Sequence, residues 1–315
     1  MNIVILDRLT LGEDLDISGA SALGTVTVYD NTAPHQVEER IRDAEVIYLN
    51  KVKLGEANLQ NAQKLRLICV AATGYDNIDV AWCRQKGIAV CNVPGYSVYS
   101  VAQLTVSMAL YLVSHLPAYT RFTASGEYTK SGTANRLTPI YHELYGKTWG
   151  IVGYGSIGAK VGEIARALGC SVLAYKRTPA EGVVCTDLDT LMEKSDIISV
   201  HLPLSDETRG IINEERIAKM KKSAILINTA RGAVTDEAAL CRALTEGRIA
   251  ALGTDVYSVE PFGEDSPFYA IKDYENVCLT PHMAWGTVEA RARCFAEMLE
   301  NTAAFYRGEL RNRID

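Results

Sequence analysis

Three glycines in the middle of the chain have the spacing of a phosphate-binding turn. They follow the apolar segment 148–152 and open the segment 157–168, which has helical composition. In such a strand–turn–helix unit the first glycine permits the turn, the second lets a pyrophosphate approach, and the third lets helix and strand pack closely. The helix N-terminus adds free N–H groups and a positive dipole end. We predict a dinucleotide site, the alternative being a plain glycine-rich turn. Its residues are Gly153, Tyr154, Gly155, Ser156, Ile157 and Gly158.

The residues after the next apolar segment, 171–175, bear on which dinucleotide binds. They are Lys176, Arg177 and Thr178. A fold that selects NAD normally has Asp or Glu here to accept from the ribose 2′-hydroxyl. Two cations and a hydroxyl would instead attract and hydrogen-bond a 2′-phosphate. The sequence favours NADP(H), with NAD(H) possible; the alternative is that these are solvated surface cations.

Three ionisable residues far apart in the sequence form a second candidate group. Arg231 lies in the segment 227–232, Glu260 in 253–261 and His282 in 279–285, each at or just beyond the end of an expected strand. Open α/β sheets bind ligands at the carboxyl ends of their strands. We therefore expect the three groups to converge, although each alone has an ordinary reading as a surface or loop residue.

These three residue types suit the reduction of a 2-keto acid, which adds a hydride to the carbonyl carbon and a proton to its oxygen. The planar guanidinium of Arg231 can bind the carboxylate and polarise the carbonyl. His282 is the expected proton donor, because imidazole changes charge near neutral pH. Glu260 would favour the imidazolium and fix its tautomer.

The elements that must position these residues alternate along the whole chain. Short apolar runs separated by helical segments are typical of βα units on parallel sheets. The segment 97–116 predicts one long helix, 119–148 a polar connecting excursion, and 287–307 a final helix that packs back on the first domain. The expected strands are 3–6, 26–29, 46–49, 67–70 and 88–91, then 148–152, 171–175, 197–201, 224–228, 250–254 and 277–280.

Composition excludes several classes of function. The 315 residues are 48 % hydrophobic and 22 % charged, with a net charge of −6, so no basic footprint for nucleic acid or anionic lipid exists. The eight cysteines are scattered with no C-x-x-C pair, which favours reduced, buried thiols over a metal site or disulfides. The first residues predict a strand rather than a signal peptide, and no apolar stretch could span a bilayer. We expect a cytoplasmic protein without membrane partners.

The chain resembles the D-2-hydroxyacid dehydrogenase family over nearly its whole length. Besides the segments above, the resemblance rests on segments 72–79, 92–97, 100–103, 146–150 and 201–204. It implies an NAD(P)-dependent oxidoreductase of α/β fold with two doubly wound parallel-sheet domains. A Rossmann cofactor domain (99–287) would be inserted into a flavodoxin-like substrate domain (1–98 and 288–315). It also implies a homodimer with helix 100–116 at the contact; a core-facing helix is the simpler reading of its apolar face.

The resemblance also implies roles for further residues. On the cofactor side these are His201, Pro203 and Thr208 toward the adenosine, and Thr229, Ala230 and Asp255 toward the nicotinamide. On the substrate side they are Asn50, Lys51, Thr73, Gly74, Tyr75, Arg231 and Trp285. Lys51 could equally be a solvated surface residue, and the Trp285 indole could serve packing rather than cover the site.

Within the family, segments 50–53, 92–97 and 282–285 resemble the glycerate dehydrogenase/hydroxypyruvate reductase branch. That branch implies hydroxypyruvate or glyoxylate as substrate, giving D-glycerate or glycolate. Leu104 departs from the branch, which commonly has His there. Open alternatives are a reductase of bulkier 2-keto acids, an enzyme that oxidises phosphite or formate, and a dinucleotide-sensing scaffold like the corepressors of this fold.

Overall fold

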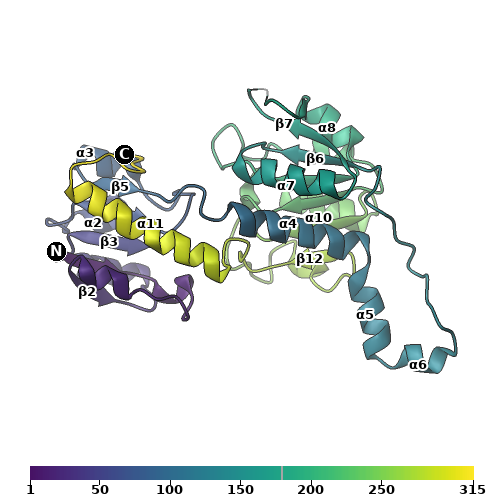
Figure 1. Cartoon of the computed structure of the whole chain (residues 1–315), viewed down its shortest axis with the longest axis horizontal. Coiled ribbons are helices and arrows are strands. Elements are labelled where there is room, and N and C mark those ends of the chain that lie inside the picture. The colour runs from purple at the N-terminus through teal and green to yellow at the C-terminus, as the bar shows by residue number, and fades with distance from the viewer. Residues whose placement is uncertain (179) are drawn as a thin grey trace. The chain divides into compact units, whose positions relative to one another are not determined.

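The computed structural model describes residues 1–178 and 180–315, and these form two compact units (Figure 1). One unit comprises Met1–Ser97 with Trp285–Asp315, and the other comprises Val98–Ala284. Each unit contains one sheet, of five and seven strands, and every strand pair is parallel. The predicted class, α/β with two parallel-sheet domains, is confirmed.

The first unit has the strand order β2-β1-β3-β4-β5. The order reverses between β1 and β3, and ligands bind beside such a reversal in open α/β sheets. The strands are β1 (Asn2–Ile5), β2 (Thr25–Val28), β3 (Val46–Leu49), β4 (Leu67–Val70) and β5 (Ala89–Cys91). The α-helices are α1 (Val37–Ile41), α2 (Glu56–Leu59), α3 (Val80–Gln85) and α11 (Val288–Tyr306), and 3-10 turns cover Arg8–Leu11, Ser18–Ala22 and Pro34–Gln36.

The strands β3, β4 and β5 are continuous apolar runs, as expected of strands that are buried on both faces of a sheet. Successive side chains alternate, so Val4 packs in one core with α1 to α3 while Ile3 and Ile5 pack in another with α11. Thr287 caps α11 by accepting from the Ala290 amide.

The second unit has the strand order β12-β11-β10-β9-β6-β7-β8. Its order reverses between β6 and β9, as in a dinucleotide-binding fold. Its strands are β6 (Thr148–Val152), β7 (Ser171–Tyr175), β8 (Val184–Cys185), β9 (Ile197–Val200), β10 (Ile225–Asn228), β11 (Ala251–Thr254) and β12 (Val277–Leu279). Its α-helices are α4 (Val98–Val113), α5 (Leu116–Ala124), α6 (Glu127–Ser131), α7 (Ser156–Ala167), α8 (Leu188–Lys194), α9 (Glu214–Ala218) and α10 (Glu237–Thr245), with 3-10 turns at Gly232–Val234 and Tyr269–Ile271.

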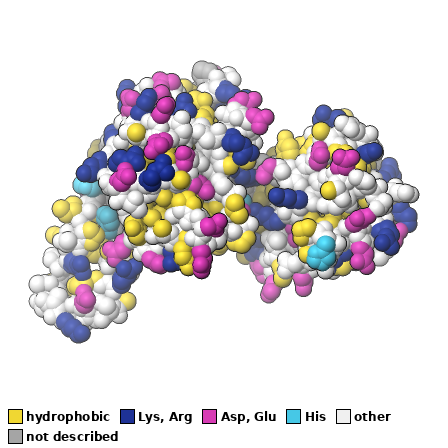
Figure 2. Space-filling view, turned by 180° about the vertical axis from the view of Figure 1, so that it is seen from behind, with side chains coloured by type: hydrophobic (Ala, Val, Ile, Leu, Met, Phe, Trp, Pro, Cys, Tyr) yellow, Lys and Arg dark blue, Asp and Glu magenta, His cyan; other side chains and the backbone are white. Residues whose placement is uncertain are grey.

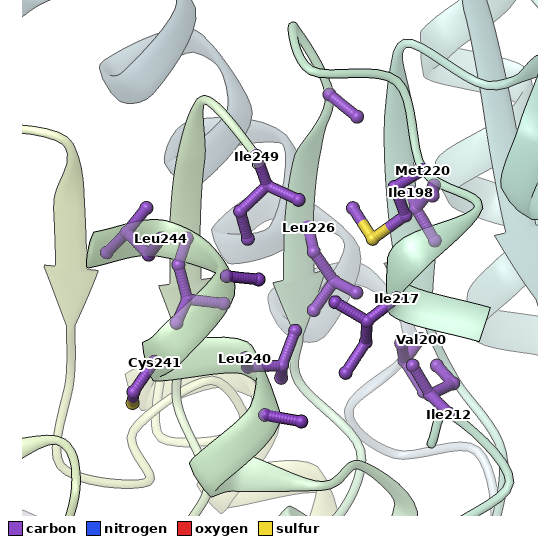
Figure 3. Close-up of a cluster of buried hydrophobic side chains, with 14 of the residues drawn as sticks. Ile198, Val200, Ile212, Ile217, Met220, Leu226, Leu240, Cys241, Leu244 and Ile249 are labelled. Carbon is purple, nitrogen blue, oxygen red and sulfur yellow. The ribbon is translucent and has the colours of Figure 1, made fainter. Parts of the chain in front are cut away.

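Two apolar cores cover the faces of the second sheet. Figure 3 shows one of them, in which Leu240 of α10 lies beside Leu226 of β10 and Ile217 of α9. The opposite face packs against α4 and α7 around the fully buried Trp149. Both faces are therefore sealed, and the carboxyl ends of the strands remain as the edge where polar residues gather.

The region after α4 differs in part from the sequence prediction. The predicted helix 97–116 ends at Val113, because His115 adopts a left-handed φ of 49° and a new helix starts beside Pro117. The segment predicted as a connecting excursion, 119–148, contains most of α5 and all of α6, which the sequence did not predict; both helices project from the second unit and bury no residue (Figure 1).

The surface carries both signs of charge. On the face in Figure 2, Lys and Arg side chains are interspersed with Asp and Glu. Among the described residues, no single helix has the length and hydropathy to cross a membrane; α4 and α5 reach that threshold only as a pair bent by 65°.

Candidate active site

The glycine-rich turn joins β6 to α7 at the reversal of the second sheet. Gly153 has a φ of +101°, and a Cβ there would lie 2.8 Å from the carbonyl carbon of His201. A Cβ on Gly158 would overlap the carbonyl oxygen of Gly153, so helix and strand touch at this point. A Cβ on Gly155 would meet no atom within 4 Å. The backbone at Gly155 is thus open to a pyrophosphate, beside the N-terminus of the 12-residue helix α7. The turn fits a dinucleotide.

Tyr154 lies within this turn and packs along α7. A Cβ on Gly162 would come within 3.2 Å of the Tyr154 ring, and Arg166 donates to its hydroxyl at 3.5 Å. Gly155 and Ser156 are exposed, Ile157 is half-buried and Gly158 is buried. The sequence-predicted run is therefore continuous in space around one helix start.

His201 adds a polar atom beside the glycine turn. It directly follows β9, whose Val200 pairs in register with Val152 of β6. The Trp149 indole donates to Ser199 Oγ at 2.9 Å, and Ser199 Oγ lies 3.0 Å from His201 Nε2. Burial lowers the pKa of His201 to about 3, so the ring is neutral. Its Nδ1 is buried and makes no hydrogen bond to any described residue, as expected of a group that serves a polar ligand.

The residues predicted to set cofactor choice are exposed where β7 ends. Lys176, Arg177 and Thr178 follow Tyr175 directly. In the loop 203–208, Thr208 donates to the Pro203 carbonyl at 2.6 Å. The same hydroxyl accepts from the Ser205 amide at 2.8 Å, so Pro203 and Thr208 belong to one braced loop.

The three catalytic candidates follow three neighbouring strands of the second sheet. Arg231 follows β10, Glu260 follows β11 and His282 follows β12, and these strands lie side by side in the order β12-β11-β10. Parallel strands present their carboxyl ends at one edge. Two polar side chains order the Arg231 turn: the Asn228 amide donates to the Arg231 carbonyl at 3.0 Å, and the Thr229 hydroxyl lies 3.0 Å from that of Thr105.

Glu260 and His282 form a direct ion-pair contact. Glu260 Oε2 lies 2.7 Å from His282 Nδ1, and Glu260 Oε1 accepts from the Tyr257 amide at 3.0 Å. The side chains are 30 % and 21 % exposed, so the pair is partly shielded while ligands can still reach it. His282 also adopts a left-handed φ of 53°, which is uncommon for a residue with a Cβ. The carboxylate therefore holds the Nδ1 side of the ring.

Asp255 anchors the loop that carries His282. Its fully buried carboxylate accepts from the Met283 and Ala284 amides at 2.8 Å each and from the Thr280 hydroxyl at 2.5 Å. Burial raises the pKa of Asp255, and these hydrogen bonds oppose that rise. Its contact with the nicotinamide stays a prediction, and so does that of Ala230, whose amide donates to Asn228.

In the first unit, Asn50 and Lys51 lie on a loop held by a residue that sequence reasoning missed. The buried Asp7, which follows β1, accepts from the Asn50 amide at 2.9 Å, from Lys51 at 2.6 Å and from Val52 at 3.2 Å. Burial raises the pKa of Asp7, and the three amides oppose that rise. The sequence signal that could have revealed Asp7 is a carboxylate just after an apolar strand.

The remaining predicted substrate residues lie elsewhere in the first unit. The Thr73 hydroxyl donates to the Val93 carbonyl at 2.9 Å, the next residue Gly74 is half-buried, and Tyr75 is 42 % exposed. Trp285 packs against the core that contains α11, with its ring edge to face with Tyr96 at 6.3 Å. The packing role of the indole is thus observed, and its covering role stays a prediction.

Comparison with known proteins identifies the family. Residues 106–284 match the family model described as D-isomer specific 2-hydroxyacid dehydrogenase, NAD binding domain. The chain is 38 % identical to a hydroxypyruvate reductase of Blautia hydrogenotrophica, over 98 % of both chains. It is 36 % identical to a glycerate dehydrogenase of Methylorubrum extorquens, covering 99 % of this chain and 98 % of that one.

A solved structure agrees with these matches. The D-lactate dehydrogenase of Aquifex aeolicus, complexed with NAD and lactic acid, superposes with a TM-score of 0.87. The match covers 100 % of this chain and 99 % of that one at 31 % identity. The chain belongs to the D-isomer specific 2-hydroxyacid dehydrogenase family, whose members are oxidoreductases with an NAD-binding domain.

Proposed function

We propose that this protein is an NADPH-preferring reductase of small 2-keto acids, with hydroxypyruvate and glyoxylate as its substrates and D-glycerate and glycolate as products. The observation that carries the proposal is the Glu260–His282 contact of 2.7 Å, three residues beyond the end of β12. A carboxylate on Nδ1 orients the ring, so Nε2 can give a proton to a carbonyl oxygen and take it back in the oxidative direction.

The remaining chemistry divides between the cofactor and Arg231. The bound nicotinamide would supply the hydride. Arg231 binds the substrate carboxylate through its planar fork and draws electron density from the carbonyl, which makes the carbon a better acceptor. The Glu260 carboxylate beside the ring stabilises the imidazolium before the proton leaves.

Cofactor preference rests on Lys176, Arg177 and Thr178. They are exposed at the end of β7, where the adenosine ribose lies in dinucleotide-binding folds. A 2′-phosphate would gain two charge-assisted contacts there, whereas a bare 2′-hydroxyl finds no carboxylate to accept its hydrogen bond among these three residues. His201 is neutral, so the positive charge for a 2′-phosphate comes from Lys176 and Arg177.

Substrate choice is supported by the two curated relatives, one named a hydroxypyruvate reductase and the other a glycerate dehydrogenase. Asn50, Lys51, Thr73, Gly74, Tyr75 and Trp285 remain our candidates for contacts with the substrate. One methylene in an apolar pocket is worth only about 1–3 kcal/mol, so discrimination against bulkier acids should be modest.

The test is a steady-state comparison of kcat/KM for hydroxypyruvate, glyoxylate, pyruvate and a branched 2-keto acid, each with NADPH and with NADH. We expect hydroxypyruvate or glyoxylate with NADPH to give the highest value. A clear preference for pyruvate or the branched acid would reject the substrate assignment. Absence of any turnover would favour the scaffold alternative.

We also propose that the protein is a cytoplasmic homodimer. The segment 116–141, which contains the projecting helices α5 and α6, carries exposed apolar side chains that would face water in a monomer. They include Leu116, Tyr128, Leu137, Ile140 and Tyr141, of which Ile140 is 75 % exposed. Light scattering should give twice the mass of 34.4 kDa. A monomer mass at micromolar concentration would reject the dimer.

A further inference from the structure

The turn that carries Glu260 is held by residues outside the catalytic group. Glu237 is the first residue of α10, and its Oε1 accepts from the Ser258 amide at 2.7 Å. Asp236, and not Glu237, caps the helix by accepting from the Ala239 amide at 2.9 Å. The carboxylate of Glu237 is therefore not needed as a cap for its own helix, and its direct partner is the turn 257–260.

The same turn is fixed from two further sides. A Cβ on Gly232, the residue after Arg231, would overlap the carbonyl carbon of Tyr257 and the amide nitrogen of Ser258. On the other side the buried Tyr257 hydroxyl donates to the Thr280 carbonyl at 3.0 Å, and the His282 amide donates to that carbonyl at 3.1 Å. The segments after β10, β11 and β12 are thus tied together through this turn.

We propose that Glu237 is a positioning residue that aims Glu260 at His282, by holding the Ser258 amide. The inference rests on the proposed proton transfer by His282. Glu237 touches neither substrate nor cofactor in this account. Its half-buried carboxylate stays with Ser258 although burial and the nearby Glu260 charge raise its pKa, which the Ser258 hydrogen bonds oppose.

If Glu237 positions the turn, residue 237 must offer a hydrogen-bond acceptor to the Ser258 amide. Two variants separate this requirement from the loss of a charge. Glu237→Ala removes the acceptor, whereas Glu237→Gln keeps an amide oxygen for Ser258 and loses the charge. Glu214→Ala is the matched control, because Glu214 is also the first residue of its helix and pairs with Arg242 at 3.1 Å. Each replacement removes a favourable charge at a helix N-terminus, and only Glu237 contacts the turn.

The first readout needs no turnover. Hydrogen exchange of the amides in 257–260 and the NMR signal of the His282 Nδ1 proton report the turn and the Glu260 contact directly. We expect Glu237→Ala to speed exchange by at least about tenfold and to weaken the Nδ1 signal, with Glu237→Gln and Glu214→Ala like wild type. Wild-type exchange and signal in Glu237→Ala, or equal loss in Glu237→Gln, would overturn the proposal.

The second readout is kinetic. We expect Glu237→Ala to lower kcat about 30-fold with the KM for NADPH unchanged, and Glu237→Gln to recover activity to within about threefold, because misplacement of about 1 Å can cost about 100-fold. An unchanged kcat in Glu237→Ala would also overturn the proposal. If wild type reduces no 2-keto acid, the proposed function fails, while the exchange and NMR results still decide whether Glu237 holds the turn.

Discussion

The two sheets of this protein reverse their strand order in the same way, yet they fill that position with opposite chemistry. In the first unit the reversal lies between β1 and β3, and the Asp7 carboxylate accepts three successive amides there. In the second unit it lies between β6 and β9, where Gly155 leaves the backbone open and His201 is neutral. Each site offers backbone N–H groups to an anion. In the first unit these groups donate to the Asp7 carboxylate, and in the second unit they suit the pyrophosphate of a dinucleotide.

A second resemblance links the units. Asp255 is the first residue after β11, and Asp7 is the second residue after β1. Both are buried, and both accept hydrogen bonds from the backbone amides of a neighbouring loop. The loop held by Asp255 carries the proton donor we propose, His282, whereas the loop held by Asp7 carries Asn50 and Lys51. The comparison teaches that one device, a buried carboxylate on backbone amides, can position either proton chemistry or binding groups.

The largest expected effect is on cofactor binding, when a carboxylate is placed at the strand-order reversal of the second sheet, as Asp7 is at that of the first. Gly155→Asp places a carboxylate where the pyrophosphate would approach, and the fold should tolerate it because a Cβ there meets no atom within 4 Å. We expect the Kd for NADPH, measured by fluorescence titration, to rise about 1000-fold through charge repulsion at short range. The neutral isostere Gly155→Asn should cost about tenfold. Equal Kd values for the two variants would show that charge does not distinguish the sites.

A smaller effect should follow from weakening the anchor of the His282 loop. Asp255→Asn presents one acceptor oxygen and an NH2 group to the Met283 and Ala284 amides, so one of these buried donors loses its partner. We expect kcat for hydroxypyruvate to fall about 100-fold, because the imidazole loses its placement. Asp273→Asn, whose side chain is 86 % exposed, is the control. Full activity in Asp255→Asn would separate the anchor from catalysis.

A smaller change is expected in the selectivity for NADPH over NADH when the cations after β7 are removed. Replacing both Lys176 and Arg177 by Ala removes two charge-assisted contacts at an exposed site. We expect kcat/KM for NADPH to fall about 30-fold and that for NADH to change less than about threefold. Steady-state rates with both cofactors measure this ratio. An unchanged ratio would mean that these cations are surface residues only.

The smallest effect on turnover is expected in the first unit. Asp7→Asn leaves a partly buried amide of the 50–52 loop without an acceptor, so the free energy of unfolding should fall by about 2 kcal/mol. We expect the KM for the 2-keto acid to rise about fivefold and kcat to stay within about twofold. Urea unfolding and initial rates measure both. A fall in kcat as large as that of Asp255→Asn would break the distinction between the two loops.

Most of the fold could be predicted because its strands are short apolar runs buried on both faces. The strands Val46–Leu49 and Ser171–Tyr175 have the predicted bounds. The strand Val184–Cys185 was missed, because two residues at a sheet edge show no pattern, with Val184 64 % exposed. The helices α5 and α6 were missed because they are short and bury no residue of the core.

The site could be predicted only where side chains carry the chemistry. Glu260 and His282 are 22 residues apart, and the parallel strand order accounts for their contact. Asp7 and Glu237 were missed because their partners are backbone amides, which have no residue type of their own in the sequence. The same holds for Gly232, whose lack of a side chain matters only against a backbone that folding brings to it.

In the function we propose, His282 gives the proton that completes reduction. The most direct test is a single-turnover measurement in which enzyme premixed with NADPH meets hydroxypyruvate, and NADPH absorbance is followed for wild type and His282→Ala. We expect oxidation to be at least about 1000-fold slower in the variant, with the Kd for NADPH within about threefold of wild type. Oxidation at the wild-type rate by His282→Ala would contradict it.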